Sequence, residues 1–153
     1  MICLIQRVSE ASVTVEGVQV GVIGRGLLGL LAVEPGDTES IAHRLVERVL
    51  AYRVFDDDAG RMNRSLAETG GELLLVSQFT LAADTRRGLR PSFTSAASPE
   101  LGRALYERAV QYAQAAMPGK VATGRFGTHM KVALVNDGHV TFRLQIPTPG
   151  ANE

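Results

Sequence analysis

The sequence of 153 residues contains no tryptophan, one cysteine and only 5% aromatic residues. So few aromatic side chains argue against a broad platform that binds single-stranded nucleic acid by base stacking. The single cysteine, Cys3, cannot form an intramolecular disulfide, and this favours a reducing compartment. Because Cys3 lies early in an apolar segment, we interpret it as a small buried hydrophobe rather than a nucleophile.

Long hydrophobic runs are also missing. The longest, residues 26–33 and 73–76, are far shorter than the roughly 20 residues of a membrane-spanning helix. Residues 1–7 lack both the basic region and the small-residue cleavage site of a signal peptide. We therefore expect no membrane contact and a cytoplasmic location.

Neither sign of charge is in excess, since 16 lysines and arginines balance 16 acidic residues. No overall field attracts nucleic acid, so any such contact is local, and DNA is not an expected partner. The histidines are far apart, and no His or Cys pair has metal-ligand spacing. We expect neither a metal nor a cofactor.

The remaining composition is that of a globular protein, with 45% hydrophobic residues, and the length fits one domain over residues 1–153 with a loose tail at 147–153. Alternating and apolar segments, turn signals and helix caps predict an α/β order. Strands are expected at 2–9, 11–16, 18–23, 27–33, 73–78, 131–135 and 140–146, helices at 39–52 and 98–116, and a long exposed loop at 84–97.

The segment Gly24 to Gly29 matches the pattern G-x-G-x-x-G of dinucleotide-binding proteins. In that fingerprint the glycines open a helix whose amides face a pyrophosphate. Here a short, continuously apolar run follows and ends at Pro35. The pattern therefore indicates a hairpin turn between strands and not a nucleotide site.

Polar side chains gather where the apolar run 73–76 ends, beginning with Ser77, Gln78 and Thr80. One interpretation is purely structural, a strand end with a hydrogen-bonded hydroxyl. The other is functional, because backbone N–H groups and the Thr80 hydroxyl at a strand end can stabilise an oxyanion without a charged residue. As a nucleophile Thr80 would be weak, since no partner base lies nearby in the sequence.

A second informative segment, residues 136–141 (Asn-Asp-Gly-His-Val-Thr), has a similarly plain interpretation. Asp-Gly between two apolar strands is typical of a hairpin turn. His139 adds a titratable imidazole there.

Taken together, residues 1–8, 77–81, 90–93 and 136–141 resemble the D-aminoacyl-tRNA deacylase family, and the pairing of Ser-Gln-Phe-Thr with Asn-x-Gly-x-Val-Thr is specific. The resemblance implies a three-layer β/β/α fold with mixed sheets and two main helices. It also implies a homodimer with active sites at the subunit interface. The implied reaction is hydrolysis of the ester that joins a D-amino acid, or glycine mischarged on alanine tRNA, to the terminal adenosine.

Residue by residue, the resemblance makes Ser77, Gln78, Phe79 and Thr80 the wall of the pocket for the terminal adenosine and the ester. Side chains would chiefly shape this site, with strand-end amides stabilising the oxyanion and the ribose hydroxyl positioning water. Thr80 would then be a water anchor or part of the wall.

In the family, a Gly-Pro dipeptide with a cis bond reaches into the partner's pocket and rejects L-amino acids. Gly138 matches the glycine, and Arg7 matches an arginine that holds the dipeptide, but His139 replaces the proline. Because a cis bond before a residue other than proline costs about 2.5–4 kcal/mol, we expect the Gly138–His139 bond to be trans unless the dimer contact compensates. Three alternatives to a selective deacylase remain. The first is a deacylase with weakened chiral selection, and the second is a dimer that binds aminoacyl-tRNA without catalysis. The third is an unrelated hydrolase with Thr80 as nucleophile.

Arg86, Arg87 and Arg90 lie in the loop 84–97. They are candidates for phosphate contacts along the acceptor stem, which would be salt-dependent and insensitive to tRNA sequence. A solvated loop without a ligand is the other interpretation.

Overall fold

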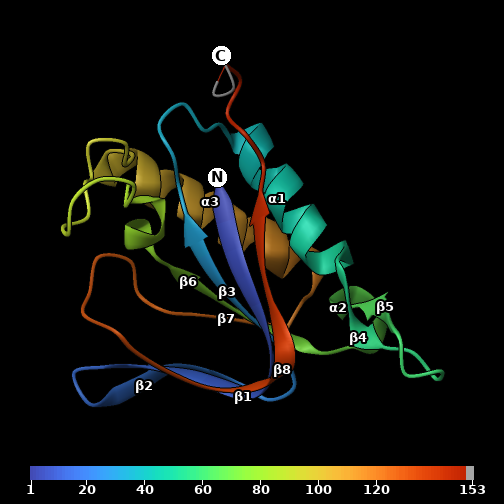
Figure 1. Ribbon diagram of the computed structural model, residues 1–153. Helices are drawn as coiled ribbons and strands as arrows, with labels where there is room; N and C mark the ends of the chain where they lie inside the picture. The colour runs from blue at the N-terminus through green and yellow to red at the C-terminus, as the bar shows by residue number, and fades with distance from the viewer. Residues whose placement is uncertain (151–153) are drawn as a thin grey trace.

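A computed structural model describes residues 1–150. The described residues form one six-stranded mixed sheet, a two-stranded hairpin and helices on one side (Figure 1). The sheet has the order β2-β1-β3-β6-β7, and β8 also pairs with β1. The elements are β1 (Ile2–Val15), β2 (Val18–Ile23), β3 (Gly26–Ala32), α1 (Glu39–Ala51), β4 (Arg53–Asp56), β5 (Met62–Ser65), α2 (Leu66–Thr69), β6 (Glu72–Ser77), η1 (Phe79–Ala82), α3 (Pro99–Ala116), β7 (Val121–Thr123) and β8 (Lys131–Gln145).

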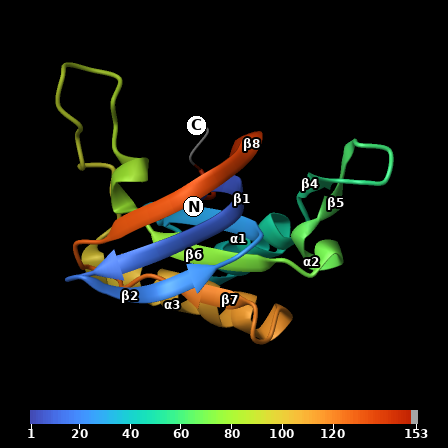
Figure 2. The ribbon, with the colours of Figure 1, turned by 90° about the horizontal axis from the view of Figure 1, so that it is seen from below.

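The central strands β3 and β6 are apolar on both faces because two hydrophobic cores cover them. Leu73 and Leu75 of β6 pack in the core beneath α1 and α3, whereas Leu74 and Val76 pack against the far half of β1 and β2. Side chains alternate between the two faces of a strand, so one strand contributes apolar side chains to both cores. Viewed from below, β1, β2 and β8 lie in front of β6, with the helices behind (Figure 2). This is the predicted three-layer β/β/α arrangement.

The glycine-rich segment opens strand β3, whereas the dinucleotide fingerprint requires glycines that open a helix. The expected hairpin is wrong, because β2 and β3 do not pair with each other. Both pair with β1, end to end along it, β2 through Ala11–Val15 and β3 through Ile2–Val8. Gly26 is required at the junction, since a Cβ there would lie 1.8 Å from the carbonyl oxygen of Glu72.

The two long strands differ most from the sequence prediction. β1 is continuous where two strands were expected, and β8 is continuous where a hairpin was expected. The register of β8 on β1 passes from Gln6–Thr141 to Val8–Asn136, so Arg7 alone faces residues 137–140. Residues 137–140 therefore form a bulge within β8, which we call the β8 bulge, and the Asp-Gly pair does not reverse the chain.

The two main helices match the prediction. Thr38 caps α1 through a hydrogen bond from the Ile41 amide, and Ser98 caps α3, which begins with Pro99. Within residues 1–150, none of the helices combines the length and apolarity needed to cross a membrane. The shorter elements α2, β5 and β7 were not predicted, since three or four residues carry little periodicity.

A buried ion pair ties the first residue to the start of α1. The amino group of Met1 donates to Glu34 Oε1 (2.9 Å), Asp37 Oδ1 (3.0 Å) and the carbonyl oxygen of Ile146 (2.9 Å). Asp37 also accepts from the Glu34 amide and from the Thr148 hydroxyl. Thr148 lies in the segment expected to be loose, whose residues 151–153 fall outside the described part of the chain.

We expect Asp37→Asn to lower the free energy of unfolding by about 3 kcal/mol, because it leaves the buried amino group without its buried carboxylate partner and with only the more exposed Glu34. Urea unfolding followed by circular dichroism measures this loss. Asp58→Asn is the matched control, since the Asp58 side chain is 98% exposed and its pair with Arg64 lies at the surface. Equal urea midpoints for the two variants would contradict the assigned role of Asp37.

Candidate functional site

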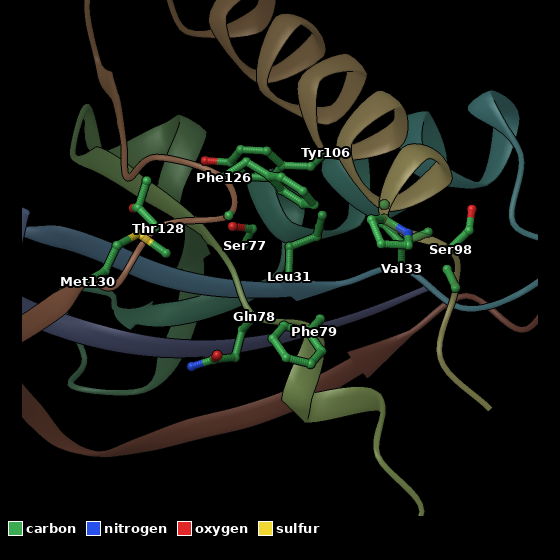
Figure 3. Close-up of a pocket in the computed structure, with 14 residues that line it drawn as sticks. Leu31, Val33, Ser77, Gln78, Phe79, Ser98, Tyr106, Phe126, Thr128 and Met130 are labelled. Atoms are coloured by element: carbon green, nitrogen blue, oxygen red, sulfur yellow. The ribbon is translucent and has the colours of Figure 1, made fainter. Parts of the chain in front are cut away.

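An apolar cavity of about 380 Å³ lies between the end of β6, the start of α3 and the segment before β8. In Figure 3, Tyr106 and Phe126 form one wall, Leu31 and Val33 the floor, and Gln78 and Phe79 the opposite edge. The volume falls within the roughly 300–1,000 Å³ of small-molecule sites. The other lining residues are Ser77, Ala97, Ser98, Pro99, Gly102, Gly127, Thr128 and Met130.

The polar segment after β6 forms the edge of this cavity. β6 ends at Ser77, one residue before the predicted end, and residues 79–82 form a short 3₁₀ helix rather than more strand. Ser77, Gln78 and Phe79 line the cavity, while Thr80 is not among the lining residues. The apolar side chains of β6 pack in the two hydrophobic cores as far as Val76. The residues after Ser77 lie outside these cores, so the chain can turn away from the sheet there.

The backbone amides of this turn differ in what they can offer a ligand. The Gln78 amide already donates to the Leu31 carbonyl (2.8 Å), so it is not free to stabilise an oxyanion. Within the described chain, the amides of Phe79 and Thr80 have no acceptor. They precede the first hydrogen bond of the turn, from the Leu81 amide to the Gln78 carbonyl (3.2 Å). Adjacent free N–H donors can stabilise a developing negative charge, and of these two residues Phe79 lines the cavity.

The Thr80 hydroxyl has no base in position to activate it. Its hydroxyl donates to Gln78 Oε1 at 3.2 Å. An amide oxygen does not take a proton at neutral pH, so this geometry argues against Thr80 as a nucleophile.

Aromatic rings form both sides of the cavity. Phe79 is 63% exposed, and the centroids of the Phe79 and Phe93 rings lie 5.5 Å apart. On the other side the centroids of Tyr106 and Phe126 lie 6.0 Å apart. The buried Tyr106 hydroxyl donates to the Leu75 carbonyl (2.8 Å), and burial raises the pKa of Tyr106 to about 12. Tyr106 is therefore a neutral structural wall at physiological pH.

Several wall residues were not predicted as site residues, among them Tyr106, Phe126 and Met130. They come from α3 and from the loop before β8, far from Ser77 in sequence. One signal was present: Gly102 interrupts a helix with an otherwise ordinary apolar stripe. A glycine inside a helix costs stability, and this one borders the cavity.

We expect Gly102→Ala to raise the free energy of unfolding by about 0.5–1 kcal/mol. A Cβ at Gly102 would meet Phe126 at 3.5 and 3.8 Å, which is ordinary contact. Gly102→Leu instead places a branched chain in the cavity and is expected to raise KM for the substrate. Urea unfolding and steady-state kinetics of the two variants check both effects. An unchanged KM in Gly102→Leu would contradict the cavity as the binding site.

The three loop arginines are not equivalent. Arg86 forms a two-pronged ion pair with Asp84 (2.9 and 2.8 Å), which holds the pKa of Asp84 well below its usual value. Arg86 is therefore already neutralised by its neighbour. Arg87 and Arg90 are exposed and form no ion pair within residues 1–150.

Arg7 and Asn136 hold the β8 bulge. Arg7 Nε donates to the Asp137 carbonyl (3.0 Å) and Arg7 Nη1 to the Val54 carbonyl (2.7 Å). Asn136 Nδ2 donates to the carbonyls of Arg7 (3.0 Å) and Val140 (3.1 Å). A Cβ at Gly138 would lie 2.8 Å from Asn136 Oδ1, so a larger residue does not fit there.

The peptide bond between Gly138 and His139 is cis, so the expectation of a trans bond is wrong. That expectation rested on the cost of a cis bond before a residue other than proline and named only a dimer contact as compensation. The path of the chain around them is set by the hydrogen bonds of Arg7 and Asn136. The His139 side chain is exposed.

Within one chain the two predicted groups of site residues are separate. The cavity is lined by Ser77, Gln78 and Phe79 and by none of the residues of the β8 bulge. Arg7 and Asp137 line a different, polar groove.

Comparison with known proteins places this fold and site in a class. A solved structure described as the c-Myc DNA Unwinding Element Binding Protein has a TM-score of 0.92 and 36% identity over 96% of this chain and 99% of its own. A second, described as a probable eukaryotic D-amino acid tRNA deacylase, shares the fold at a TM-score of 0.80 and 19% identity, covering 94% and 98% of the two chains. The chain therefore belongs to the class of proteins with this β/β/α fold.

Residues 4–145 match the family described as D-Tyr-tRNA(Tyr) deacylase. Relatives named D-aminoacyl-tRNA deacylase include one from Thioalkalivibrio sulfidiphilus, 62% identical over 97% of this chain and 99% of its own length. Another, from Xanthomonas campestris, is 59% identical over 95% and 99%. The chain belongs to the D-Tyr-tRNA(Tyr) deacylase family, as the sequence motifs predicted.

Proposed function

We propose that this protein hydrolyses the ester between a D-amino acid, or glycine mischarged on alanine tRNA, and the terminal adenosine of tRNA. One observation carries the proposal: Ser77, Gln78 and Phe79 line a cavity in a chain that is 62% identical to a named D-aminoacyl-tRNA deacylase. The reaction is a proofreading step, since it removes amino acids that translation must not use.

The geometry of the cavity suits a nucleoside with an attached ester. Its apolar floor and the rings of Phe79, Tyr106 and Phe126 suit the flat faces of an adenine. The polar groups, Ser77, Gln78 and the free amides, lie along one edge, where the ester would be placed.

The proposed chemistry uses the main chain for charge stabilisation. A water molecule attacks the ester carbonyl, and the amides of Phe79 and Thr80 stabilise the negative charge that develops on its oxygen. The bond between the carbonyl carbon and the ribose oxygen then breaks, which releases the free amino acid, and the ribose oxygen takes up the proton that the water loses. The neighbouring ribose hydroxyl positions the water; among the described residues the Thr80 hydroxyl bonds to an amide oxygen and not to a base. The Thr80 hydroxyl, held by Gln78, serves as a water anchor.

We further propose a homodimer in which the β8 bulge of one subunit completes the cavity of the other. Support comes from the separation of bulge and cavity within one chain, and from exposed apolar side chains beside the bulge. Leu134 is 36% and Val135 50% exposed on β8, and Val22 on β2 is 56% exposed. Gly138 and Arg7 would then select substrates by leaving room for glycine or a D side chain and none for an L side chain.

For the rest of the tRNA, we propose Arg87 and Arg90 as exposed phosphate contacts, with Arg86 contributing through the loop that its pair with Asp84 orders. RNA, not DNA, is the proposed nucleic-acid partner. Because aminoacyl-tRNA is used in the cytoplasm, we propose that location for the protein.

The deciding experiment follows ester loss from D-Tyr-tRNA and L-Tyr-tRNA with purified protein. We expect rapid loss of the D ester and loss of the L ester only at the spontaneous rate. His139→Pro is the matched variant, and we expect it to keep the D-over-L ratio, because Arg7 and Asn136 hold the bulge in either case. Loss of neither ester by the unaltered protein would overturn the proposal. A low D-over-L ratio that proline restores would favour the weakly selective alternative.

A further inference from the structure

A second groove adjoins the cavity on the far side of Phe126. It has a volume of about 560 Å³ and shares Tyr106, Phe126 and Thr128 with the cavity. The shared residues mean that Phe126 forms part of a common wall between the two spaces. The groove is open to solvent and lies against α3.

The chemistry of this groove differs from that of the cavity. It presents two cations, Arg103 and Arg125, and one acid, Glu107, whose carboxylate lies 3.6 Å from Arg103. Gln111, Gln114 and Thr123 add hydrogen-bonding side chains, and Val110 adds an apolar one beside the shared rings of Tyr106 and Phe126. A net positive groove with amide groups suits a phosphate joined to a polar base.

Arg103 lies beside Phe126, the residue that lines both the groove and the cavity. Its Cζ is 4.9 Å from the centre of the Phe126 ring, and its side chain is 57% exposed. Its Nη2 lies 3.8 Å from the position of a Cβ on Gly127, which lines the cavity. The guanidinium therefore stacks on the dividing wall while its remaining N–H groups face solvent.

We propose that this groove binds the nucleotide that precedes the terminal adenosine of the substrate, with Arg103 and Arg125 contacting the phosphates on either side of it. The inference rests on the proposed function, which places the terminal adenosine in the cavity. The RNA chain must then leave the cavity over one of its walls. At the opposite edge Phe79 packs on Phe93, whereas at the Phe126 wall a cationic groove continues directly from the cavity.

The test compares two substrates that differ only beyond the terminal nucleoside: D-Tyr-tRNA and D-tyrosyl-adenosine. For Arg103→Ala and for Arg125→Ala we expect the kcat/KM ratio of D-Tyr-tRNA to D-tyrosyl-adenosine to fall about tenfold. The slope of log(kcat/KM) against log salt for D-Tyr-tRNA should fall by about 1 for each variant. Arg103→Lys should recover the slope, since it keeps the charge.

Arg44→Ala is the control, since Arg44 is an exposed arginine of α1 outside both spaces. An equal loss on both substrates would overturn the proposal, because Arg103 would then only support Phe126. An unchanged ratio in both arginine variants would also overturn it. If the unaltered protein cleaves neither substrate, the proposed function itself fails, and this inference fails with it.

Discussion

Phe79→Pro is expected to hydrolyse D-Tyr-tRNA about 100- to 1000-fold more slowly than Phe79→Ala, the loss typical of removing one oxyanion donor. Both substitutions remove the phenyl ring that packs on Phe93. Only proline also removes the backbone N–H, which has no acceptor within the described residues. The difference between the two variants therefore isolates the contribution of one amide.

Proline is compatible with the backbone at this position. Phe79 is the first residue of the 3₁₀ turn, where proline is well tolerated, and Gln78 before it is not helical (φ −146°, ψ 78°). Circular dichroism and urea unfolding of both variants check that the fold is retained. Single-turnover rates within threefold of each other would contradict an oxyanion role for the Phe79 amide.

Arg7→Ala is expected to lower kcat/KM for D-Tyr-tRNA about 10- to 100-fold, the range that corresponds to about 1.5–3 kcal/mol for a hydrogen bond from a charged donor. The Arg7 side chain is only 11% exposed, and it joins the β8 bulge to the Val54 carbonyl. Without it the bulge loses its connection to β4, and the proposed partner cavity loses its selective edge. We also expect a lower D-over-L ratio.

Two variants control this result. Arg7→Lys keeps a charge but cannot reach both carbonyls with a planar fork, so we expect an intermediate loss. Arg61→Ala removes an exposed arginine of the hairpin that follows β4, and it should leave the D-over-L ratio unchanged. The assigned role of Arg7 is contradicted if its alanine variant keeps the full D-over-L ratio while remaining folded.

Much of the fold could be predicted because its strongest determinants are local. The apolar residues of β3 and β6 indicate strands covered on both faces, and the caps at Thr38 and Ser98 mark the two main helices. The β8 bulge could not be predicted from local signals, because Asp-Gly is typical of a hairpin turn. Its path depends on Arg7 and Asn136, and Arg7 lies more than a hundred residues away in sequence.

The site residues also fall into a part that local sequence predicts and a part that depends on tertiary packing. Ser77, Gln78 and Phe79 could be placed together because they are consecutive at a strand end. The wall of Tyr106 and Phe126 could not, since it forms only when α3 packs beside the segment before β8. Which amides of the turn are free was likewise decided by a tertiary contact, the hydrogen bond from Gln78 to Leu31 on β3.

The most direct measurement is a crystal structure with D-tyrosine joined to 3′-amino-3′-deoxyadenosine through a non-hydrolysable amide. The account predicts adenine between Phe79 and Phe126, and an aminoacyl carbonyl oxygen about 2.7–3.1 Å from the Phe79 and Thr80 amides. It also predicts that the β8 bulge of a second copy lies against the aminoacyl group. A ligand bound elsewhere, or a separate monomer whose bulge faces only solvent, would contradict it.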